Sequence, residues 1–405
     1  MPVGYFQLPE LSSVAGIRLS AQAAKVRYEG RDDVVVIELA EGSRCAAVFT
    51  RNAFCAAPVI VAREHLAQAS PRYLLINSGN ANAGTGVPGL DDARRSCEAL
   101  AQRAGCEVSQ VLPFSTGVIG ERLPVDRIES VLDGALATLS ADNWSVAARA
   151  IMTTDTVAKG LSITLKVDGQ TVTLTGMTKG SGMICPDMAT MLAYIATDAD
   201  VEGEALQACL AQAVEQSFNR ITIDGDTSTN DACVLVATGV SATACIDAGH
   251  ADYPAFCEAV NEICTRLAQF IVRDGEGATK FVTVSVEGGR DSEECLQVAY
   301  TVAHSPLVKT ALFASDPNWG RILAAVGRAG LLQLDIDRVE LWLDDVCIVR
   351  DGGVALDYRE AEGQRVMNQD EILIRIVLNR GDTSETVWTS DLSHDYVSIN
   401  AAYRS

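Results

Sequence analysis

The sequence predicts a mixed α+β protein with two domains, and three observations support this fold class. The chain has 405 residues, which is too long for one small hydrophobic core. Its composition is 48% hydrophobic and 21% charged, as in ordinary globular proteins. Stretches typical of strands and amphipathic stretches typical of helices occur in both halves of the chain. We place the domain boundary in the Gly-rich segment 273–280, which gives an N-terminal domain at 1–275 and a smaller C-terminal α/β domain at 276–405.

The individual elements follow from the period of the apolar residues. Strands are predicted at 33–39, 45–50, 73–77, 111–114, 161–167, 171–174, 191–196, 232–237, 281–286, 338–343, 346–350, 371–379 and 384–389. Helices are predicted from about Asp91 onward and at 125–138, 143–152, 202–218, 254–272, 291–304 and 321–329. Asp168-Gly169 between two alternating stretches indicates a hairpin. The polar residues within 371–379 allow that stretch to form an exposed edge strand.

The charge excludes several classes of partner. The formal net charge is −21 and the pI is near 4.6, so no basic stripe is available for a nucleic acid or an anionic membrane surface. No apolar run is long enough to span a bilayer, and the first residues lack the pattern of a signal peptide. The twelve cysteines contain no Cys-x-x-Cys pair, which indicates reduced thiols in a cytoplasmic protein. The four histidines show no metal-ligand spacing, and no metal site is predicted.

The stretch Lys179–Asp198 contains the main candidate for a catalytic residue. Its first half is rich in Gly and Pro, and its second half, 191–196, is an apolar run of the kind found in strands buried on both faces. Thr190 lies between the two halves. A hydroxyl at the start of a buried strand is held rigidly, which suits a residue that is first cleaved at its own N-side and then used as a nucleophile. For an isolated Ala-Thr junction, a β-branched residue that simply opens a strand is the more frequent explanation.

Two segments match binding motifs only formally. Gly84, Gly86 and Gly89 have the spacing of a dinucleotide-binding loop, but Pro88 interrupts them and no acidic residue ends the next strand. The acidic segment 224–235 resembles a calcium loop, yet its glycine is misplaced and Leu235 stands where a bidentate Glu is needed. We reject both motifs and interpret the second segment as a polar turn before a buried strand.

Ser115-Thr116-Gly117 follows a predicted strand. A Thr-Gly pair at this position can direct a hydroxyl and a backbone N–H at one point, as in an oxyanion hole. As an isolated dipeptide it is more often only a turn.

A resemblance to a known family connects these observations. The segment Lys-Gly-Ser-Gly-Met-Ile at 179–184, followed by Pro186 and Met-Ala-Thr-Met-Leu at 188–192, closely resembles the self-cleaving signature of the ornithine acetyltransferases (glutamate N-acetyltransferases) of arginine biosynthesis. The resemblance covers nearly the whole chain. Its other marks are Asn-Ala-Asn-Ala at 80–83, Ser-Thr-Gly at 115–117, Thr-Thr-Asp-Thr at 153–156, Glu-Gly-Ala-Thr-Lys at 276–280, Ser-Pro-Leu-Val-Lys-Thr-Ala at 305–311, Asp-Pro-Asn-Trp-Gly-Arg at 316–321 and Asp-Tyr-Val-Ser-Ile-Asn at 395–400.

The resemblance implies a layered α-β-β-α catalytic domain of the aminopeptidase/ornithine acetyltransferase type. It implies cleavage between Ala189 and Thr190, which gives an α fragment of 1–189 and a β fragment of 190–405, and a heterotetramer of two α and two β fragments. The implied reaction moves an acetyl group from N2-acetylornithine to glutamate, with no bound cofactor. Some relatives also use acetyl-CoA as a donor and others only recycle the acetyl group, and the sequence leaves these alternatives open.

The resemblance also implies the site residues. Thr190 is the implied nucleophile, and Thr116 and Gly117 carry the oxyanion hole. The implied substrate contacts are Thr156, Lys179, Thr190, Glu276, Asn400 and Ser405. These side chains suit the substrates, because a Lys can pair an α-carboxylate and a Glu can pair the ornithine ammonium. Ser405 stands where many relatives carry Thr and keeps the hydroxyl.

Two rival interpretations remain at this point. A self-cleaving aminopeptidase or amidase of related architecture would pass the acyl group to water instead of glutamate. A regulatory or binding protein could have kept the fold without catalysis. The central signature, Glu276 and the segment 400–405 favour the transferase over the first rival, and Thr190 with Thr116 and Gly117 argues against the second.

Overall fold

The structure of the chain is a computed structural model that describes residues 2–4, 6–185, 191–241 and 243–402. The chain divides into two compact units. The larger unit comprises Gln7–Asn219 and Asp226–Ile271, and the smaller one Met1–Phe6, Arg220–Gly225 and Val272–Ser405. The domain boundary expected after residue 275 stays a prediction. Within the described part of the chain, no helix combines the length and the hydropathy that crossing a membrane requires.

The larger unit contains two sheets. The first has the strand order β1-β2-β4-β5 and contains β1 (Ile17–Gln22), β2 (Val34–Leu39), β4 (Tyr73–Asn80) and β5 (Val111–Val118). The second has the order β3-β10-β8-β7-β6 and contains β3 (Arg44–Phe49), β10 (Ala232–Ala237), β8 (Leu192–Thr197), β7 (Gln170–Lys179) and β6 (Lys159–Val167). The pairs β4–β5 and β8–β10 are parallel, and the other pairs are antiparallel.

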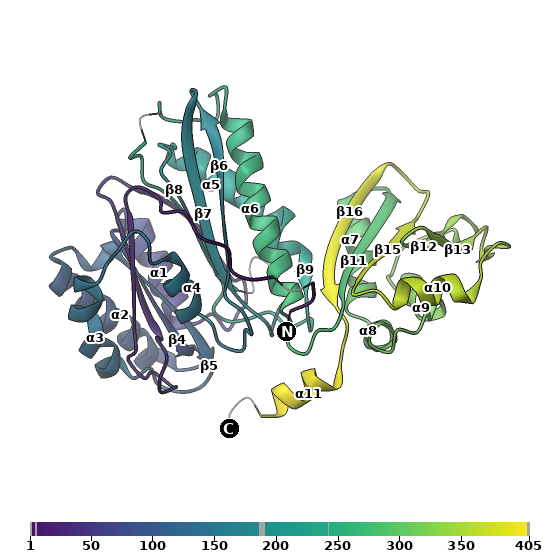
Figure 1. Cartoon of the computed structure of the whole chain (residues 1–405), viewed down its shortest axis with the longest axis horizontal. Coiled ribbons are helices and arrows are strands. Elements are labelled where there is room, and N and C mark those ends of the chain that lie inside the picture. The colour runs from purple at the N-terminus through teal and green to yellow at the C-terminus, as the bar shows by residue number, and fades with distance from the viewer. Residues whose placement is uncertain (1, 5, 186–190, 242, 403–405) are drawn as a thin grey trace. The chain divides into compact units, whose positions relative to one another are not determined.

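The two sheets stack between helices, and strand β2 shows why. Its side chains alternate between the two faces of the sheet. Val35 and Ile37 share one core with Tyr194 of β8 and with residues of β10, whereas Val34 and Val36 share another core with helical side chains. The helices of this unit are α1 (Ala57–Gln68), α2 (Gly86–Ala104), α3 (Val125–Ala137), α4 (Trp144–Ala150), α5 (Gly203–Gln216) and α6 (Tyr253–Arg273), the last of which extends to the unit boundary. Helices α2 and α3 cover the first sheet, and α5 and α6 cover the second (Figure 1).

Strand β8 is central in the second sheet, and all six of its residues are buried. The apolar run at 191–196 predicted such a strand, and this prediction is confirmed. On the neighbouring strand, a Cβ added to Gly176 would lie 3.0 to 3.2 Å from side-chain atoms of Leu267, Ile195 and Ile263. Helix α6 therefore packs closely on the sheet at this point, and a side chain at 176 would require its neighbours to move.

The smaller unit is built on one seven-stranded sheet of order β14-β13-β12-β15-β11-β16-β9. Its strands are β9 (Ile221–Thr222), β11 (Phe281–Gly289), β12 (Glu340–Leu343), β13 (Val346–Arg350), β14 (Gly353–Val354), β15 (Glu371–Val377) and β16 (Thr383–Ser390). Its helices are α7 (Ser292–Ala303), α8 (Pro306–Phe313), α9 (Trp319–Gly327), α10 (Glu360–Met367) and α11 (His394–Ala401). Helices α7, α8 and α9 contribute to the core that β11, β12 and β15 share.

Strand β15 corrects one expectation. The stretch 371–379 was a candidate for an exposed edge, but β15 lies in the interior of the sheet between β11 and β12. Its isoleucines at 372, 374 and 376 are buried in the core. On the opposite face, the Arg375 guanidinium lies 4.5 Å from the centre of the Trp342 ring. The polar residues therefore mark a half-buried face and not an edge.

Candidate active site

The start of β8 is the reference point of the candidate site. Leu192 lies opposite Lys179, the last residue of β7, and opposite Ala232, the first residue of β10. The backbone N–H of Ala232 donates to the carbonyl oxygen of Met191 at 3.0 Å. The proposed cleavage site, Ala189 and Thr190, lies outside the described residues. The described residues on either side of it have defined contacts. Met191 pairs with β10, and the Cys185 carbonyl accepts a hydrogen bond from the Thr227 hydroxyl at 2.9 Å.

Thr116 and Gly117 lie near the end of β5, with Thr116 only 6% exposed. Their partners in the parallel register are Ser78 and Gly79 of β4. Gly117 has φ 133°, and a Cβ there would lie 2.3 Å from the Gly79 carbonyl carbon. No other residue fits this position without moving the backbone. The Thr-Gly pair is therefore fixed within the sheet and is not a free surface turn.

Asn230 connects this strand end to the start of β10. Its side-chain amide donates to the carbonyl oxygens of Ala81 at 2.6 Å and Ser115 at 2.9 Å. Its side-chain oxygen accepts from the Thr229 hydroxyl at 2.5 Å. Asn230 is two residues before Ala232, whose neighbour in the sheet is Leu192. The end of β5, the end of β7 and the start of β10 are thus all linked to the start of β8.

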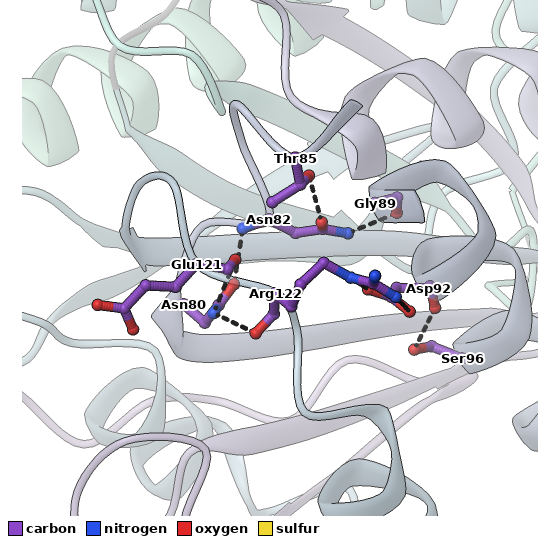
Figure 2. Close-up of polar contacts among 8 residues, drawn as sticks. All are labelled: Asn80, Asn82, Thr85, Gly89, Asp92, Ser96, Glu121 and Arg122. Atoms are coloured by element: carbon purple, nitrogen blue, oxygen red, sulfur yellow. Dashed lines mark hydrogen bonds and ion pairs between the residues drawn. The ribbon is translucent and has the colours of Figure 1, made fainter. Parts of the chain in front are cut away.

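The Asn-rich loop after β4 supports the same strand end (Figure 2). The side chain of Asn80 donates to the carbonyl oxygens of Glu121 and Arg122, and its oxygen accepts from the Asn82 N–H at 2.8 Å. The Asn82 amide donates to the Gly89 carbonyl at 2.9 Å. A Cβ on Gly89 would lie 1.9 Å from the Thr85 hydroxyl oxygen, so close local packing explains this glycine without a dinucleotide.

Asp155 and Lys159 form a completely buried ion pair beside Lys179. The Lys159 ammonium donates to the Asp155 carboxylate at 2.6 Å, and both side chains are 0% exposed. The carboxylate also accepts from the N–H groups of Gly180 at 2.7 Å and Thr153 at 2.9 Å. Burial acts to raise the pKa of Asp155, but the charges of Lys159 and Lys179 and these hydrogen bonds hold the pKa well below its usual range. The pair fixes the backbone next to Lys179.

Asp231 is a second buried carboxylate of this region, at 2% exposure. Burial raises its pKa well above the usual value, and a hydrogen bond from Ser228 and the charge of Lys179 only partly oppose this effect. Its Oδ2 atom has no hydrogen-bond partner among the described residues. A buried carboxyl group of this kind is stabilised in its protonated form.

The remaining predicted residues of the larger unit occupy the same neighbourhood. Lys179 is half-buried, and its ammonium lies 3.5 Å from the Thr153 hydroxyl. Thr156 is exposed in the loop between α4 and β6, next to Asp155.

In the smaller unit, the structure brings Glu276 and Asn400 together. Glu276 is 8% exposed, and its carboxylate accepts a hydrogen bond from the Asn400 amide at 2.7 Å. Helix α11, which carries Asn400, is held in place by a hydrogen bond of 2.6 Å from the Ser393 hydroxyl to the Gly277 carbonyl. A Cβ on Gly277 would lie 2.5 Å from the Tyr396 nitrogen, which requires glycine there. Ser405 lies outside the described residues.

A cluster of possible metal ligands lies away from this region. Asp168, His250 and Asp252 bring one ligand atom each to within 4.8 Å of one another. However, the His250 Nδ1 atom accepts a hydrogen bond from the Asp252 N–H at 3.1 Å, so the neutral ring carries its proton on Nε2. The Nε2 atom lies 3.5 Å from the nearest oxygen of the Asp168 carboxylate.

Sequence reasoning missed Asp155, Lys159, Asn230 and Asp231 as parts of the site. Asp155 stood in the family motif at 153–156, and a Lys four residues after an Asp was a signal for a pair. Asn230 and Asp231 stood in a segment that also matches a stretch of the family but was interpreted as a polar turn without a direct catalytic role. What the sequence could not show is that all four side chains are buried.

Comparisons with known proteins agree on one family. A model of the ArgJ family matches residues 18–405. The arginine biosynthesis bifunctional protein ArgJ of Pseudomonas fluorescens (strain Pf0-1) is 58% identical over 406 residues, which cover 100% of both chains. The protein of the same name from Psychrobacter arcticus is also 58% identical, over 407 residues. The crystal structure of the ArgJ protein from Bacillus halodurans is 36% identical, with a TM-score of 0.50, and covers 53% of this chain and 100% of that one.

The fold, the site and these comparisons define an acyltransferase of mixed α+β architecture. The chain belongs to the ArgJ family of arginine biosynthesis. The predictions of the α+β fold class, of the family and of an acyltransferase are confirmed.

Proposed function

We propose that this enzyme transfers the acetyl group of N2-acetyl-L-ornithine to L-glutamate through an acetyl ester on Thr190. The observation that carries the proposal is the arrangement at the start of β8. Thr190 precedes that strand by two residues, Lys179 and Ala232 flank the strand, and Asn230 ties it to the Thr116–Gly117 strand end. Membership of the ArgJ family supports a role in arginine biosynthesis.

Maturation comes first in this proposal. The Thr190 hydroxyl attacks the Ala189 carbonyl, an N-to-O shift forms an ester, and water hydrolyses that ester to give fragments 1–189 and 190–405. The backbone before the cleavage site supports a strained loop. Met183 has φ 56°, a left-handed conformation that costs energy for a residue with a side chain.

The transfer then follows from the new amino terminus. An α-amino group titrates at about 7.7–8.0, so part of it is neutral at physiological pH and can accept the hydroxyl proton of Thr190. The hydroxyl oxygen attacks the acetyl carbon, while the Thr116 hydroxyl and the Gly117 N–H stabilise the oxyanion. Ornithine leaves with the proton. The amino group of glutamate then attacks the ester and regenerates Thr190.

Substrate recognition uses opposite charges. Lys179 pairs with the α-carboxylate that both substrates carry, and Thr156 and the Ser405 hydroxyl add hydrogen bonds. Glu276 pairs with the side-chain ammonium of ornithine. Its partner among the described residues, the Asn400 amide, is neutral, which suits a carboxylate that receives a cation. The buried Asp155–Lys159 pair positions Lys179 through the hydrogen bond to the Gly180 N–H.

The name of the relatives includes the word bifunctional. We include acetyl-CoA in the proposal as a second acetyl donor to the same threonine, without a bound cofactor. The proposed assembly contains two α and two β fragments in the cytoplasm.

Mass spectrometry and kinetics test the proposal together. Acetylornithine without glutamate should add one acetyl group to the 190–405 fragment at Thr190, and initial rates with both substrates varied should give parallel double-reciprocal lines. Thr190→Ala should leave an uncut, inactive chain, whereas Thr190→Ser should cleave and react more slowly because it loses the methyl group that fixes χ1. Intersecting lines together with no trapped acetyl group would refute the covalent path.

A second measurement separates the transferase from a hydrolase of the same family of folds. Glutamate should accelerate the consumption of acetylornithine and should be recovered as N-acetylglutamate. Consumption that is independent of glutamate and releases acetate would instead assign an amidase.

A further inference from the structure

A cavity on the far side of the second sheet has no role in the proposed reaction. It has a volume of about 440 Å³ and is lined by residues of α5 and α6. The lining includes the polar side chains of Gln212, Gln216, Glu258 and Asn261. The buried Oδ1 atom of Asn261 has no hydrogen-bond partner among the described residues. The cavity can therefore admit water and small polar molecules.

Two cysteines from different helices face this cavity. Cys209 belongs to α5 and is 1% exposed, whereas Cys257 belongs to α6 and is partly exposed. Tyr253, Cys257 and Asn261 are spaced by four residues and so share one face of α6. The Tyr253 hydroxyl donates to the Ala205 carbonyl of α5 at 3.0 Å, which holds the two helices together next to the thiols.

The two thiols differ in their acidity. The interaction with the Cys209 thiol lowers the pKa of Cys257, and burial opposes this effect. Interaction with Cys257 and burial raise the pKa of Cys209. Redox-sensitive cysteines combine an accessible, acidic thiol with an adjacent resolving thiol. Here the partly exposed Cys257 and the buried Cys209 line the same cavity.

We infer that Cys257 and Cys209 form a redox-sensitive thiol pair, in which Cys257 reacts with a hydroperoxide and Cys209 resolves the product as a disulfide. The Cys257 sulfur attacks one peroxide oxygen, the O–O bond breaks, and hydroxide (or an alkoxide) leaves with the electron pair. The Cys209 thiol then attacks the sulfenic acid, which forms the S–S bond and releases water. Two thiols are oxidised and one peroxide is reduced. A thiol reductant reverses the change.

The first test measures reactivity at individual cysteines. Cys245 is a matched comparison because it is more exposed than Cys257, while burial raises its pKa. In the purified full chain at pH 7, iodoacetamide should alkylate Cys257 at least tenfold faster than Cys245, as read by peptide mapping. Equal rates, or a faster reaction of Cys245, would overturn the inference.

The second test follows oxidation by hydrogen peroxide. The wild-type protein should lose 2 Da and yield a peptide in which Cys209 and Cys257 are linked, and dithiothreitol should restore the original mass. Cys257→Ser should abolish this product, and Cys245→Ser should leave it unchanged. Cys209→Ser should stop at a sulfenic acid on Cys257 that dimedone traps. If Cys209→Ser does not fold, the wild-type peptide map alone decides, and a disulfide between other cysteines would contradict the inference.

Discussion

Two buried aspartates lie near the same lysine, yet they have opposite protonation preferences. The charge of Lys179 acts to lower the pKa of both Asp155 and Asp231. The pKa of Asp155 is lowered, whereas that of Asp231 is raised. Burial acts in the same direction on both and cannot explain the difference. Asp155 has a second cation, Lys159, in direct contact and two backbone N–H donors, whereas Asp231 has neither a contacting cation nor a partner for Oδ2 among the described residues.

This contrast indicates that one nearby cation does not offset the effect of burial on the pKa of a carboxyl group. Desolvation of an ion costs several kcal/mol, and only contact with a counter-ion plus hydrogen bonds offsets it. The segment 153–159 is therefore a fixed support whose carboxylate is stabilised in its charged form, whereas burial in the segment 226–231 favours the protonated form of Asp231. The predictions below alter one member of this comparison at a time.

Lys159→Met should have the largest effect. It leaves the Asp155 carboxylate buried without its counter-ion, which costs about 3–5 kcal/mol of unfolding free energy. The pKa of Asp155 should then move in the direction seen for Asp231. Urea unfolding followed by circular dichroism measures the loss.

Lys166→Met is the matched control for that variant. Lys166 lies on the same strand and is exposed, and within the described ranges it donates to the Thr171 hydroxyl at 2.7 Å. Its replacement should change the unfolding free energy by no more than about 0.5 kcal/mol. Equal losses in the two variants would show that contact with Lys159 does not stabilise the charged Asp155.

Glu276 adds a third type of buried carboxylate, one whose observed partner is a neutral amide. Glu276→Gln should weaken the use of acetylornithine far more than the use of acetylglutamate in the reverse direction, because only acetylornithine carries an ammonium group. Losing a charge-assisted contact costs about 1.5–3 kcal/mol, or roughly 10- to 150-fold in kcat/KM.

Glu293→Gln, on the exposed side of α7, should leave both activities unchanged. If Glu276→Gln lowers the use of both substrates equally, Glu276 does not recognise the ornithine side chain.

Local sequence patterns predicted much of the fold. Strand β8 and helix α6 were found because an unbroken apolar run and a 3.6-residue period persist over their whole lengths. Helices α1, α8, α10 and α11 were not predicted; the last three have eight residues each, and so few turns give a weak period. The interior position of β15 depends on pairing with β11 and with β12, about ninety and thirty residues away, which no local pattern specifies.

The site was predictable only where a family motif covered it. Thr116, Gly117, Lys179, Glu276 and Asn400 came from the resemblance, and their roles stay predictions. The buried partners of these residues were not predicted, because Lys159 and Asp231 are charged residues of types that usually lie on surfaces. Their burial results from the stacking of strands from distant parts of the chain.

Asp231→Asn should change the unfolding free energy little at low pH. Its effect should grow as the pH rises. The folded state holds the Asp231 proton more tightly than the unfolded state, whose pKa is about 3.9. The contribution of Asp231 to the stability of the wild-type protein is therefore fully present below about pH 4. It is lost as the pH rises toward the pKa of Asp231 in the folded state. Asn replaces the protonated acid, so the variant should match the wild type within about 1 kcal/mol at pH 4. At higher pH the unfolding free energy of the variant should exceed that of the wild type by about 1.4 kcal/mol for each pKa unit of the shift.

Asp155 is present in both proteins, so its contribution cancels from the difference. That contribution is lost in the opposite direction, as the pH falls below about 4. Urea unfolding at pH 4 to 8 measures that difference, with the exposed Asp382→Asn as the control that should show no trend. A difference that is constant with pH would mean that Asp231 is already ionised in the folded protein and that the two aspartates do not differ.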